Sequence, residues 1–303
     1  MKFSIVVATY NRKEILKKCL ECVLLQTYKD FELLVVDDGS TDCTDETMSH
    51  YSDERIRYIK LDKNYGTATP ARNRGIEEMT GDALIIWDSD DFLLPNALEV
   101  LQSGFDEHEE VGIVCTSTDF CKDGVKQEYP RSESTYLSVT DWFGGKKSKD
   151  SEIVAIRKDL IGDVRFESRS IDFMFYAKIV GGVKPKIYYV NETCGVINLE
   201  SDSLSLTHAR KKKNNVLSIE RAPILDSYLE KYGELYFIAN AHGKYAGFAF
   251  GSAIGYLRDG DYRNSKKMFV KANKAHFTLT WKVMELLVSI PLLNIIFHKF
   301  AKR

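Results

Sequence analysis

The segment 84–95 reads LIIWDSDDFLLP, an apolar run typical of a buried strand that ends in a cluster of acids. Asp88, Asp90 and Asp91 follow the run directly. Like charges this close raise each other's pKa values unless positive charge lies among them. The simplest explanation is a bound cation, and hard carboxylate ligands favour Mg or Mn over zinc.

The composition is that of a folded protein. With 303 residues, the chain is long enough for two domains or for one large domain with an appendage. It has 44% hydrophobic and 28% charged residues, and its net charge of -2 gives no general attraction to nucleic acid, so we expect no nucleic-acid partner. Six scattered cysteines indicate free thiols in a reducing compartment. The apolar run FSIVVA after Met1 and Lys2 is too short for a signal peptide, so we expect a cytoplasmic protein.

Short apolar runs alternate with helical patterns in the first part of the chain, which predicts βα units around a mostly parallel sheet. The expected strands are 3–8, 31–36, 56–61, 83–87 and 112–116. The expected helices are 13–26, 44–50 with Asp42 as N-cap, 71–79 after Pro70, and 96–105 after Pro95.

Polar loops follow three of these strands. They are TYN after the first strand (Thr9, Tyr10, Asn11), DDGSTD after the second (37–42) and DSDD after the fourth (88–91). Open sheets of this kind bind ligands beyond the carboxyl ends of their strands. Because the three loops would converge on one edge of the sheet, we expect a binding site there.

The later part of the chain has a different pattern. Polar sequence over 118–150 predicts loops, followed by a strand at 153–156, a helix at 170–180 and a strand at 187–190. Beyond residue 205 the pattern is helical, so we expect one α/β domain over 1–205 and a helical region over 206–303. The expected helices there are 217–232, 235–257 and 262–276, the last two forming a hairpin across a Gly-Asp turn.

The tail 278–303 holds the apolar stretch VMELLVSIPLLNIIF followed by HKFAKR. Glu285, Pro291 and Asn294 interrupt it, and it is shorter than the roughly 20 residues needed to cross a bilayer. An interfacial helix with a basic end fits this pattern, which would place the protein peripherally on the inner face of the cell membrane. A buried terminal helix fits it as well.

The acids suit the chemistry of a diphosphate. Asp88 and Asp90 are separated by one residue, so in an extended segment both point to the same side and could share one cation. A cation held there would neutralise a diphosphate leaving group. Asp38 at a strand end could accept from a pyrimidine imide while Tyr10 covers the ring, and Arg72 could meet a phosphate or orient the aspartates.

The motifs VVATYNR, LLVVDDGSTD and ARNRGIEEMTGDALIIWDSDDFLLP occur in this order. As a set they resemble the inverting family-2 glycosyltransferases with a GT-A fold. The resemblance implies an α/β protein with a GT-A type, Rossmann-like sheet flanked by helices and, here, a helical C-terminal extension. It is close over about the first 110 residues and weaker to about residue 205.

The resemblance also implies roles for individual residues. Ala8, Thr9, Tyr10 and Asn11 match the first loop, which would contact the nucleotide. Asp38 would bind the base and Arg72 the phosphates. The D-x-D motif matches Asp88, Ser89 and Asp90, in which Asp88 and Ser89 would contact the nucleotide and Asp88 and Asp90 the metal. Trp87 stands where the family has a smaller apolar residue.

The family needs a carboxylate that deprotonates the acceptor hydroxyl, and the segment VRFESRSIDFMFYAKIV has the corresponding shape. Asp172 falls on the base position, although Ile171 replaces the acid that precedes it in the family. Glu167 is the second choice. An Asp at a helix start is also an ordinary cap. Where many relatives place a His, this chain has Asn198.

The function implied is metal-dependent transfer of a sugar, with inversion, from a nucleotide sugar to a hydroxyl of a glycan or polyprenol-linked acceptor in surface polysaccharide or glycoconjugate synthesis. The family default donor is a UDP-hexose, and the cofactor would be Mg or Mn. The alternative is a sugar-nucleotide-binding scaffold that has lost catalysis. A nucleotidyltransferase is disfavoured because the first loop is not glycine-rich, and a dehydrogenase because no G-x-G-x-x-G follows the first strand.

Overall fold

A computed structural model of the protein describes residues 1–122, 125–127, 133–144, 152–167, 172–198, 242–275 and 279–289. The chain divides into two compact units, Met1–Glu200 and Ser201–Arg303. The sequence pattern places this boundary after residue 205 and the structure after residue 200.

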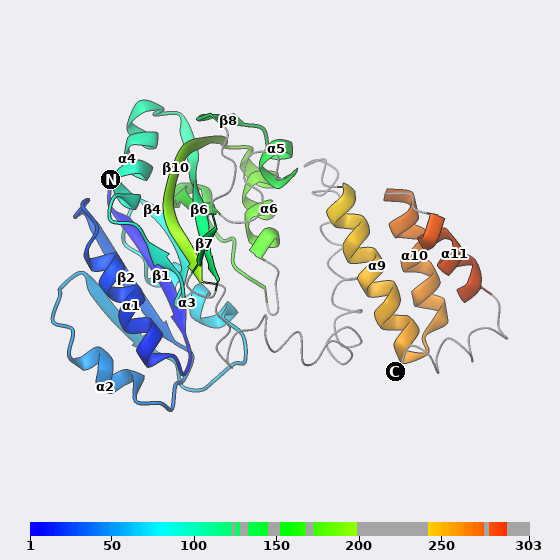
Figure 1. Ribbon diagram of the computed structural model, residues 1–303, viewed down its shortest axis with the longest axis horizontal. Coiled ribbons are helices and arrows are strands. Elements are labelled where there is room, and N and C mark those ends of the chain that lie inside the picture. The colour runs from blue at the N-terminus through cyan, green and yellow to red at the C-terminus, as the bar shows by residue number, and fades with distance from the viewer. Residues whose placement is uncertain are drawn as a thin grey trace. The chain divides into compact units, whose positions relative to one another are not determined.

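The first unit is built on one mixed sheet (Figure 1). Its main strand order is β3-β2-β1-β4-β9-β6-β10-β5, with β7 beside β6 and β8 beside β10. The sheet is parallel from β3 to β4, and β9 then joins antiparallel between β4 and β6. The strands are β1 Phe3–Thr9, β2 Phe31–Asp37, β3 Ile56–Lys60, β4 Ala83–Asp88, β5 Phe92–Leu93, β6 Val111–Lys122, β7 Val125–Gln127, β8 Thr135–Leu137, β9 Glu152–Arg157 and β10 Lys186–Asn198.

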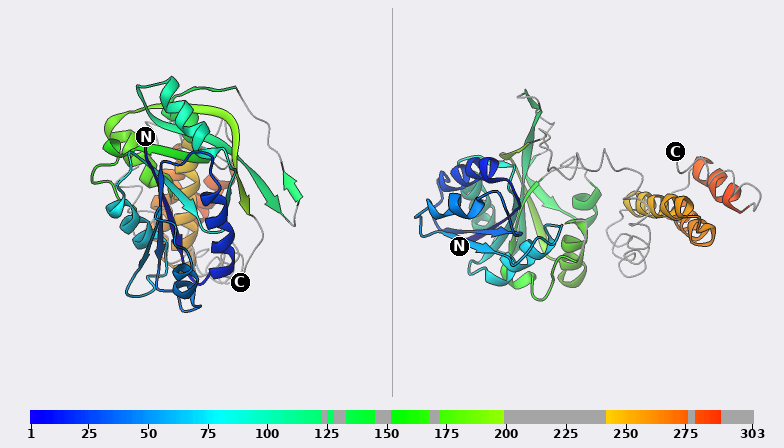
Figure 2. Two further views of the ribbon diagram at one scale, coloured as in Figure 1. Left: turned by 90° about the vertical axis from the view of Figure 1, so that its left-hand side faces the viewer. Right: turned by 90° about the horizontal axis from the view of Figure 1, so that it is seen from below.

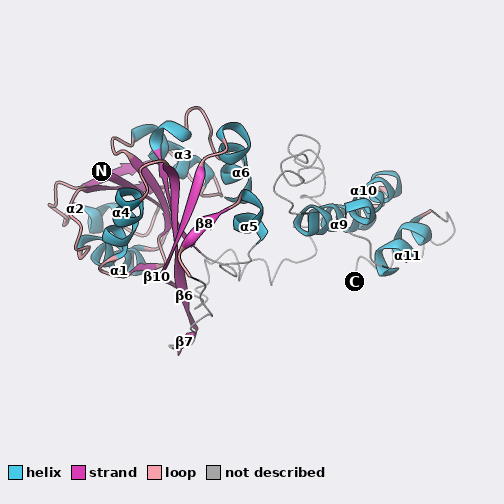
Figure 3. Cartoon of the chain, turned by 90° about the horizontal axis from the view of Figure 1, so that it is seen from above, coloured by secondary structure: helices cyan, strands magenta, loops and turns pink. Residues whose placement is uncertain are grey.

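Helices cover both faces of the sheet (Figure 3). The faces differ by the alternation of side chains along β1: Ile5 and Val7 pack with α1 and α4, whereas Val6 packs under Gly75 of α3. A Cβ on Gly75 would lie 2.2 Å from Val6 Cγ1, so only glycine lets α3 approach this closely. The helices of this unit are α1 Lys13–Leu24, α2 Thr44–Ser49, α3 Thr69–Glu78, α4 Ala97–Glu107, α5 Val139–Gly144 and α6 Asp172–Val183.

Strands β1, β2 and β4 are buried on both faces, which is why they read as unbroken apolar runs. Cys19 of α1 belongs to the same core. All six cysteines are free thiols, as expected.

The segment 118–150 is not the stretch of loops that the sequence predicts. Strand β6 continues to Lys122, and β7, β8 and α5 follow within the described part of the segment. Thr118 and Asp119 on β6 are buried although polar, because β10 lies alongside them. Polar side chains that are buried by a neighbouring strand give no alternating pattern, and this caused the error.

Asp42 precedes the N-cap position of α2 by one residue, and its Oδ1 accepts a hydrogen bond from the hydroxyl of Thr44, the first residue of the helix. The N-cap position is Cys43, which adopts a left-handed backbone conformation (φ 63°) and makes no side-chain cap. Asp42 Oδ2 also accepts a hydrogen bond from the backbone amide of Lys13 at 3.1 Å, and so satisfies an amide in the first turn of α1. A cap supplied from a distant loop leaves no signal in the local sequence.

In the second unit, α9 (His242–Asp259) and α10 (Tyr262–Ala275) form the predicted helical hairpin (Figure 2). The turn places Gly260 at φ 82°, and Asp261 Oδ1 accepts from the amide of Asn264, which caps α10. The hydroxyl of Ser265 donates to the carbonyl of Ala253 at 2.8 Å where the helices cross.

A further helix, α11, spans Leu279–Val288. The expected helix at 217–232, the beginning of the one at 235–257 and the tail beyond Ser289 lie outside the described residues. Within the described part of the chain, every helix is too short or too polar to traverse a lipid bilayer.

Candidate active site

The three polar loops of the sequence prediction meet at one edge of the sheet. Strand β1 lies between β2 and β4, and its residue Ala8 pairs with Val36 on one side and with Asp88 on the other. The amide of Asp38 donates to the carbonyl of Thr9 at 2.9 Å, which joins the first two loops. The loops after β1, β2 and β4 are therefore neighbours in space.

Asp88, Asp90 and Asp91 each place one carboxylate oxygen within 4.8 Å of the others. The tight turn that gathers them is fixed by backbone contacts: the amide of Asp91 donates to the carbonyl of Asp88 at 3.2 Å, and the indole of Trp87 donates to the carbonyl of Asp91 at 3.1 Å. Trp87, which departs from the family pattern, thus supports the acidic turn from the buried side of the sheet.

Asp91 is the most buried of the three acids, with 7% of its surface exposed. Burial raises its pKa to about 8, and the charges of Asp88 and Asp90 act in the same direction. The amide of Asn198 at the end of β10 donates to Asp91 Oδ1 at 2.9 Å. Asn198 therefore reaches the acidic turn through its backbone.

Two arginines hold the other two acids. Arg72 Nη2 of α3 lies 2.7 Å from Asp88 Oδ1, and Arg12 Nη1 lies 3.0 Å from Asp90 Oδ2. Arg12 also approaches the buried Ser89, whose hydroxyl lies 3.5 Å from Nη1. The Arg72 guanidinium lies over the ring of Phe166 at 5.3 Å, so the aromatic ring supports it from below.

The acidic turn meets the chemical requirements of a divalent cation. It offers only carboxylate oxygens, which suit Mg or Mn better than zinc. Burial is the main cause of the raised pKa of Asp91, and the nearby charges of Asp88 and Asp90 add to it; a bound cation would counter both effects. The group consists of the three acids that the sequence predicts to cluster, Asp88, Asp90 and Asp91.

The two acids after β2 have different surroundings. Asp37 is fully buried, with Oδ1 accepting from the Ser40 amide at 2.8 Å and Oδ2 from the Tyr58 hydroxyl at 2.6 Å. Asp38 accepts from the amide of Tyr65 with both oxygens, at 3.1 and 3.2 Å, and burial raises its pKa. Asp37 therefore has a structural role, and Asp38 is oriented from one side.

The first loop is fixed to the second by Asn11, which has a positive φ of 50°. Its backbone amide donates to the Ser40 hydroxyl at 2.8 Å, and its side-chain oxygen accepts from the Thr41 amide at 2.7 Å. Tyr10 is half-buried at the point where the chain leaves β1, after the buried Thr9. The structure thus uses Asn11 to shape the loop that would contact the nucleotide.

Helix α6 begins at Asp172, the expected base, but the side chain of this residue lies outside the described part of the structure. Glu167 Oε1 pairs with Lys178 Nζ at 2.7 Å. Asn73 holds the chain just before Glu167, because its side chain both donates to the carbonyl and accepts from the amide of Phe166 at 2.8 Å.

Comparison with known proteins decides the family: the model of glycosyl transferase family 2 matches residues 4–172. The chain belongs to glycosyl transferase family 2. It is therefore a transferase, and the matched segment runs from the second residue of β1 to the first residue of α6.

This family-2 glycosyltransferase has relatives of several lengths. It is 28% identical to glycosyltransferase GlyG of Streptococcus pneumoniae, over 67% of this chain and 73% of that one. It is 26% identical to the GalNAc(5)-diNAcBac-PP-undecaprenol beta-1,3-glucosyltransferase of Campylobacter jejuni, over 75% of both. Its 38% identity to S. pneumoniae glycosyltransferase GlyA spans 36% of this chain but only 16% of that protein.

Solved structures confirm the GT-A type fold of this glycosyltransferase. S. aureus TarS 1–349, crystallised with UDP-GlcNAc, superposes with a TM-score of 0.70 over all of this chain and 90% of that one, at 16% identity. A mannosyltransferase of Pyrobaculum calidifontis, in complex with GDP-Man and Mn2+, gives a TM-score of 0.50 at 15% identity.

Sequence reasoning assigned no role to Arg12 or Asn73 of this glycosyltransferase, and it counted Asp91 in the acidic cluster without giving it an individual role. Arg12 and Asn73 stand beside assigned residues in the motifs TYNR and ARNR, and Asp91 completes DSDD. Motif membership was therefore the available signal. Their partners, Asp90, Phe166 and Asn198, are distant in the sequence, which is why the contacts could not be predicted.

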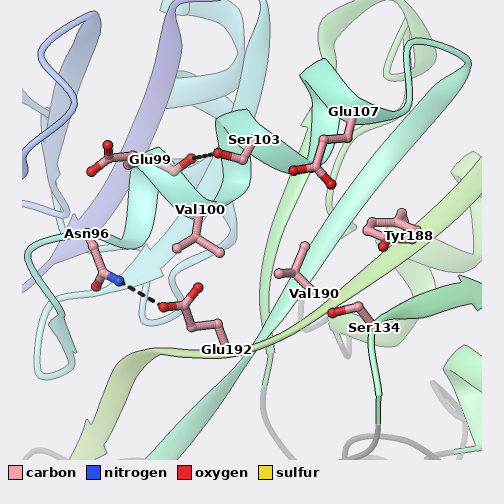
Figure 4. A pocket seen from close by; sticks show the side chains of 10 residues that line it. Asn96, Glu99, Val100, Ser103, Glu107, Ser134, Tyr188, Val190 and Glu192 are labelled. Carbon is pink, nitrogen blue, oxygen red and sulfur yellow. Dashed lines mark hydrogen bonds between the residues drawn. The ribbon is translucent and has the colours of Figure 1, made fainter.

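A cavity of about 340 Å³ lies between α4 and β10, outside the acidic turn (Figure 4). The side chains of Glu99, Glu107 and Glu192 line it, and Asn96 Nδ2 donates to Glu192 at 3.2 Å. Three carboxylates would repel a nucleoside diphosphate. The candidate active site is therefore the edge formed by the loops after β1, β2 and β4.

Proposed function

We propose that the protein is a metal-dependent, inverting glycosyltransferase that transfers a sugar from a UDP-sugar, UDP-hexose favoured, to a hydroxyl of a glycan or lipid-linked acceptor. The observation that carries this proposal is the grouping of Asp88, Asp90 and Asp91 at the end of β4, beside the loop that follows β1. Family membership supplies the class of reaction, and the metal, donor and acceptor are what we add.

The carboxylates and an arginine would each bind a different part of the metal–diphosphate group of the donor. Asp88 and Asp90 would hold Mg or Mn, which when bound neutralises charge on the diphosphate. Arg72 Nη2 lies 2.7 Å from Asp88 Oδ1, which places its guanidinium beside the acidic turn, and we assign this guanidinium to the phosphates of the donor. Ser89 lies between the two acids and completes this group.

The nucleoside would lie against the first two loops. Asp38, held by the Tyr65 amide, has further lone pairs with which it can accept from a pyrimidine imide. Tyr10 would cover the base, and Ala8, Thr9 and Asn11 would form the wall beside it. A uracil imide fits an acceptor carboxylate, which favours UDP. The complex of TarS with UDP-GlcNAc supports the same choice.

Inversion requires a base opposite the leaving group, and we assign it to Asp172 at the start of α6. It would take the proton of the acceptor hydroxyl as that oxygen attacks the anomeric carbon in one displacement. Glu167 is the less suitable candidate because Lys178 already engages its carboxylate.

For the acceptor we favour a lipid-linked saccharide in surface polysaccharide or glycoconjugate synthesis. The name of the C. jejuni relative specifies an undecaprenol-linked acceptor, and the alignment with that relative, at 26% identity, covers three quarters of this chain. A polyprenol-linked acceptor would bring the enzyme to the inner face of the cell membrane, in agreement with the apolar, basic-ended tail of the sequence.

A hydrolysis screen tests the proposal. Sugar nucleotides are incubated with the protein and Mn or Mg, and release of the nucleoside diphosphate is measured. We expect UDP from one UDP-sugar, and loss of at least about 100-fold of this activity in Asp90→Ala.

The matched control is Asp159→Ala, which removes an exposed carboxylate from the short helix Lys158–Leu160 and should leave turnover unchanged. Binding of a donor without any turnover would instead identify a scaffold that has lost catalysis. Turnover that survives chelation of the metal would contradict the role given to the acidic turn.

A further inference from the structure

Helix α11 exposes three apolar side chains and buries its one acid, which is unusual for a helix on the surface of a protein in water. Leu279, Val283 and Leu286 are 73%, 44% and 56% exposed and recur at spacings of four and three residues, which places them on one face. Glu285, in contrast, is only 8% exposed. An ordinary amphipathic helix buries its apolar stripe and exposes its acids.

Specific contacts hold α11 in this orientation. Glu285 Oε2 accepts from Asn273 of α10 at 2.9 Å, and its Oε1 pairs with Lys282 at 2.7 Å. Trp281 stacks on Phe250 of α9, with ring centroids 4.7 Å apart. Turning the helix to bury its leucines would break these contacts, so the second unit itself presents the apolar face.

Helix α10, on which α11 packs, is basic. The segment Tyr262–Ala275 contains five lysines and arginines and no acid. Arg263, Lys266, Lys267 and Lys274 are exposed, and Val270 lies among them at 44% exposure. Its opposite face, with Met268 and Phe269, is buried. Basic helices with apolar residues on the exposed side are typical of membrane surfaces.

We propose that the exposed face of α11 (Leu279, Val283, Leu286), together with the basic face of α10, binds the surface of a membrane that contains anionic lipid. The apolar side chains would enter the boundary between headgroups and acyl chains, and the basic side chains would remain at the phosphate level.

The positive charge of α10 favours anionic lipid over other possible partners of this surface. A second copy of the unit would bring two basic helices together, which is unfavourable. The segment 290–303 of the same chain carries Lys299, Lys302 and Arg303 and no acid, so charge does not favour it as a cover. A nucleic acid would meet the lysines but gain nothing from three exposed aliphatic side chains. Anionic lipid complements both features.

Membrane binding would bring the enzyme to a lipid-linked acceptor, and in this respect alone it rests on the proposed function. The test uses vesicles without donor or acceptor. Failure of vesicle binding would therefore leave the sugar-transfer proposal standing, and the reverse also holds.

The full chain is sedimented with vesicles of phosphatidylcholine alone and of phosphatidylcholine with phosphatidylglycerol. We expect binding to the anionic vesicles that weakens with salt. The triple variant L279D/V283D/L286D should lose about tenfold or more in partitioning. The pair K266E/K274E should lose about fivefold for each lysine on anionic vesicles.

Leu25→Asp is the matched control, because Leu25 is an exposed leucine (67%) that follows α1 in the other unit. It should bind as the unmodified chain does. Circular dichroism establishes that each variant is folded. The proposal would be overturned if the chain bound neither type of vesicle, or if the triple variant bound the anionic vesicles as the unmodified chain does. A dimer in light scattering that dissociates on the triple substitution would overturn it too, because it would make this face a contact between copies.

Discussion

Nη1 of Arg12 lies 3.0 Å from Oδ2 of Asp90, and both side chains are largely buried, at 15% and 23% exposure. Asp90 is one of the two acids expected to hold a cation. The guanidinium therefore occupies space beside the same carboxylate that a metal would use, and its positive charge repels an incoming cation.

Arg12→Ala should for this reason raise the affinity for Mn2+ by about fivefold, which corresponds to about 1 kcal/mol for a partly buried charge. Isothermal titration with Mn2+ in the absence of donor measures it. Arg55→Ala is the control, since Arg55 pairs with Asp53 at 2.7 Å instead of with the acidic turn. An unchanged or lower affinity would show that Arg12 positions Asp90 for the metal and does not compete with it.

The two acids after β2 should separate into a structural and a binding residue. Asp38→Asn should weaken UDP binding about tenfold or more, because it removes the charge of the proposed acceptor of the base. A hydrogen bond to a charged group contributes about 1.5–3 kcal/mol. Asp37→Asn should instead lower the free energy of unfolding by about 1–3 kcal/mol, since buried Asp37 accepts from Tyr58 and Ser40.

Calorimetric titration with UDP and thermal melts distinguish these outcomes. The assignment of Asp38 to the base fails if its variant binds UDP as tightly as the unmodified chain does.

Asn73 should matter for the acceptor side of the reaction. Its side chain holds the amide and carbonyl of Phe166, close before Glu167 and the helix that starts at Asp172. Asn73→Ala should lower the free energy of unfolding by about 1–3 kcal/mol. It should also reduce transfer to an acceptor more than hydrolysis of the donor. Both rates are measured on the same preparation.

The control is Asn96→Ala, because the side-chain amide of Asn96 donates to the exposed Glu192 at 3.2 Å, outside the candidate active site, and its loss should change neither rate. Equal losses of transfer and hydrolysis in Asn73→Ala would mean that the contact of Asn73 with the backbone of Phe166 acts on the donor site.

Glu32 should make stability depend on acid pH. Burial acts to raise its pKa, but bonds from the Ser4 hydroxyl and from the amides of Thr80 and Gly81 outweigh burial and lower the pKa to about 2. A carboxyl whose pKa is lower when folded stabilises the protein above its unfolded value near 4.5. This contribution, about 1–3 kcal/mol, is lost as the pH falls from 4.5 toward 2.

Urea unfolding at a series of pH values measures this slope, and Glu32→Gln should flatten it. Glu110→Gln is the comparison, because the exposed Glu110 also has a pKa lowered to about 2, by Tyr136 and Lys186, where water competes for the same bonds. Its removal should leave the slope nearly unchanged. A steep acid slope that survives in Glu32→Gln would assign the effect to other carboxylates.

Local spacing in the sequence was enough for much of the catalytic unit. Apolar runs predicted β1, β2 and β4 to within one residue, because strands buried on both faces must be apolar throughout, and the half-buried β3 was predicted to within one residue as well. The acids of DSDD were predicted to gather because one short turn carries them all. The family followed from the order of the motifs, and the matched model confirms it.

Contacts between distant segments were decided by the tertiary structure alone. Asp42 accepts from the first amide of α1, β10 buries the polar end of β6, and Arg12 meets Asp90 across 78 positions of sequence. The sequence placed an apolar stripe on α11 but could not say which way it faces. That choice depends on the bond from Asn273 to Glu285, which exists only once α10 and α11 have packed. The spacing of residues along the chain determines which side chains lie on the same face of a helix. Only tertiary packing determines what that face contacts.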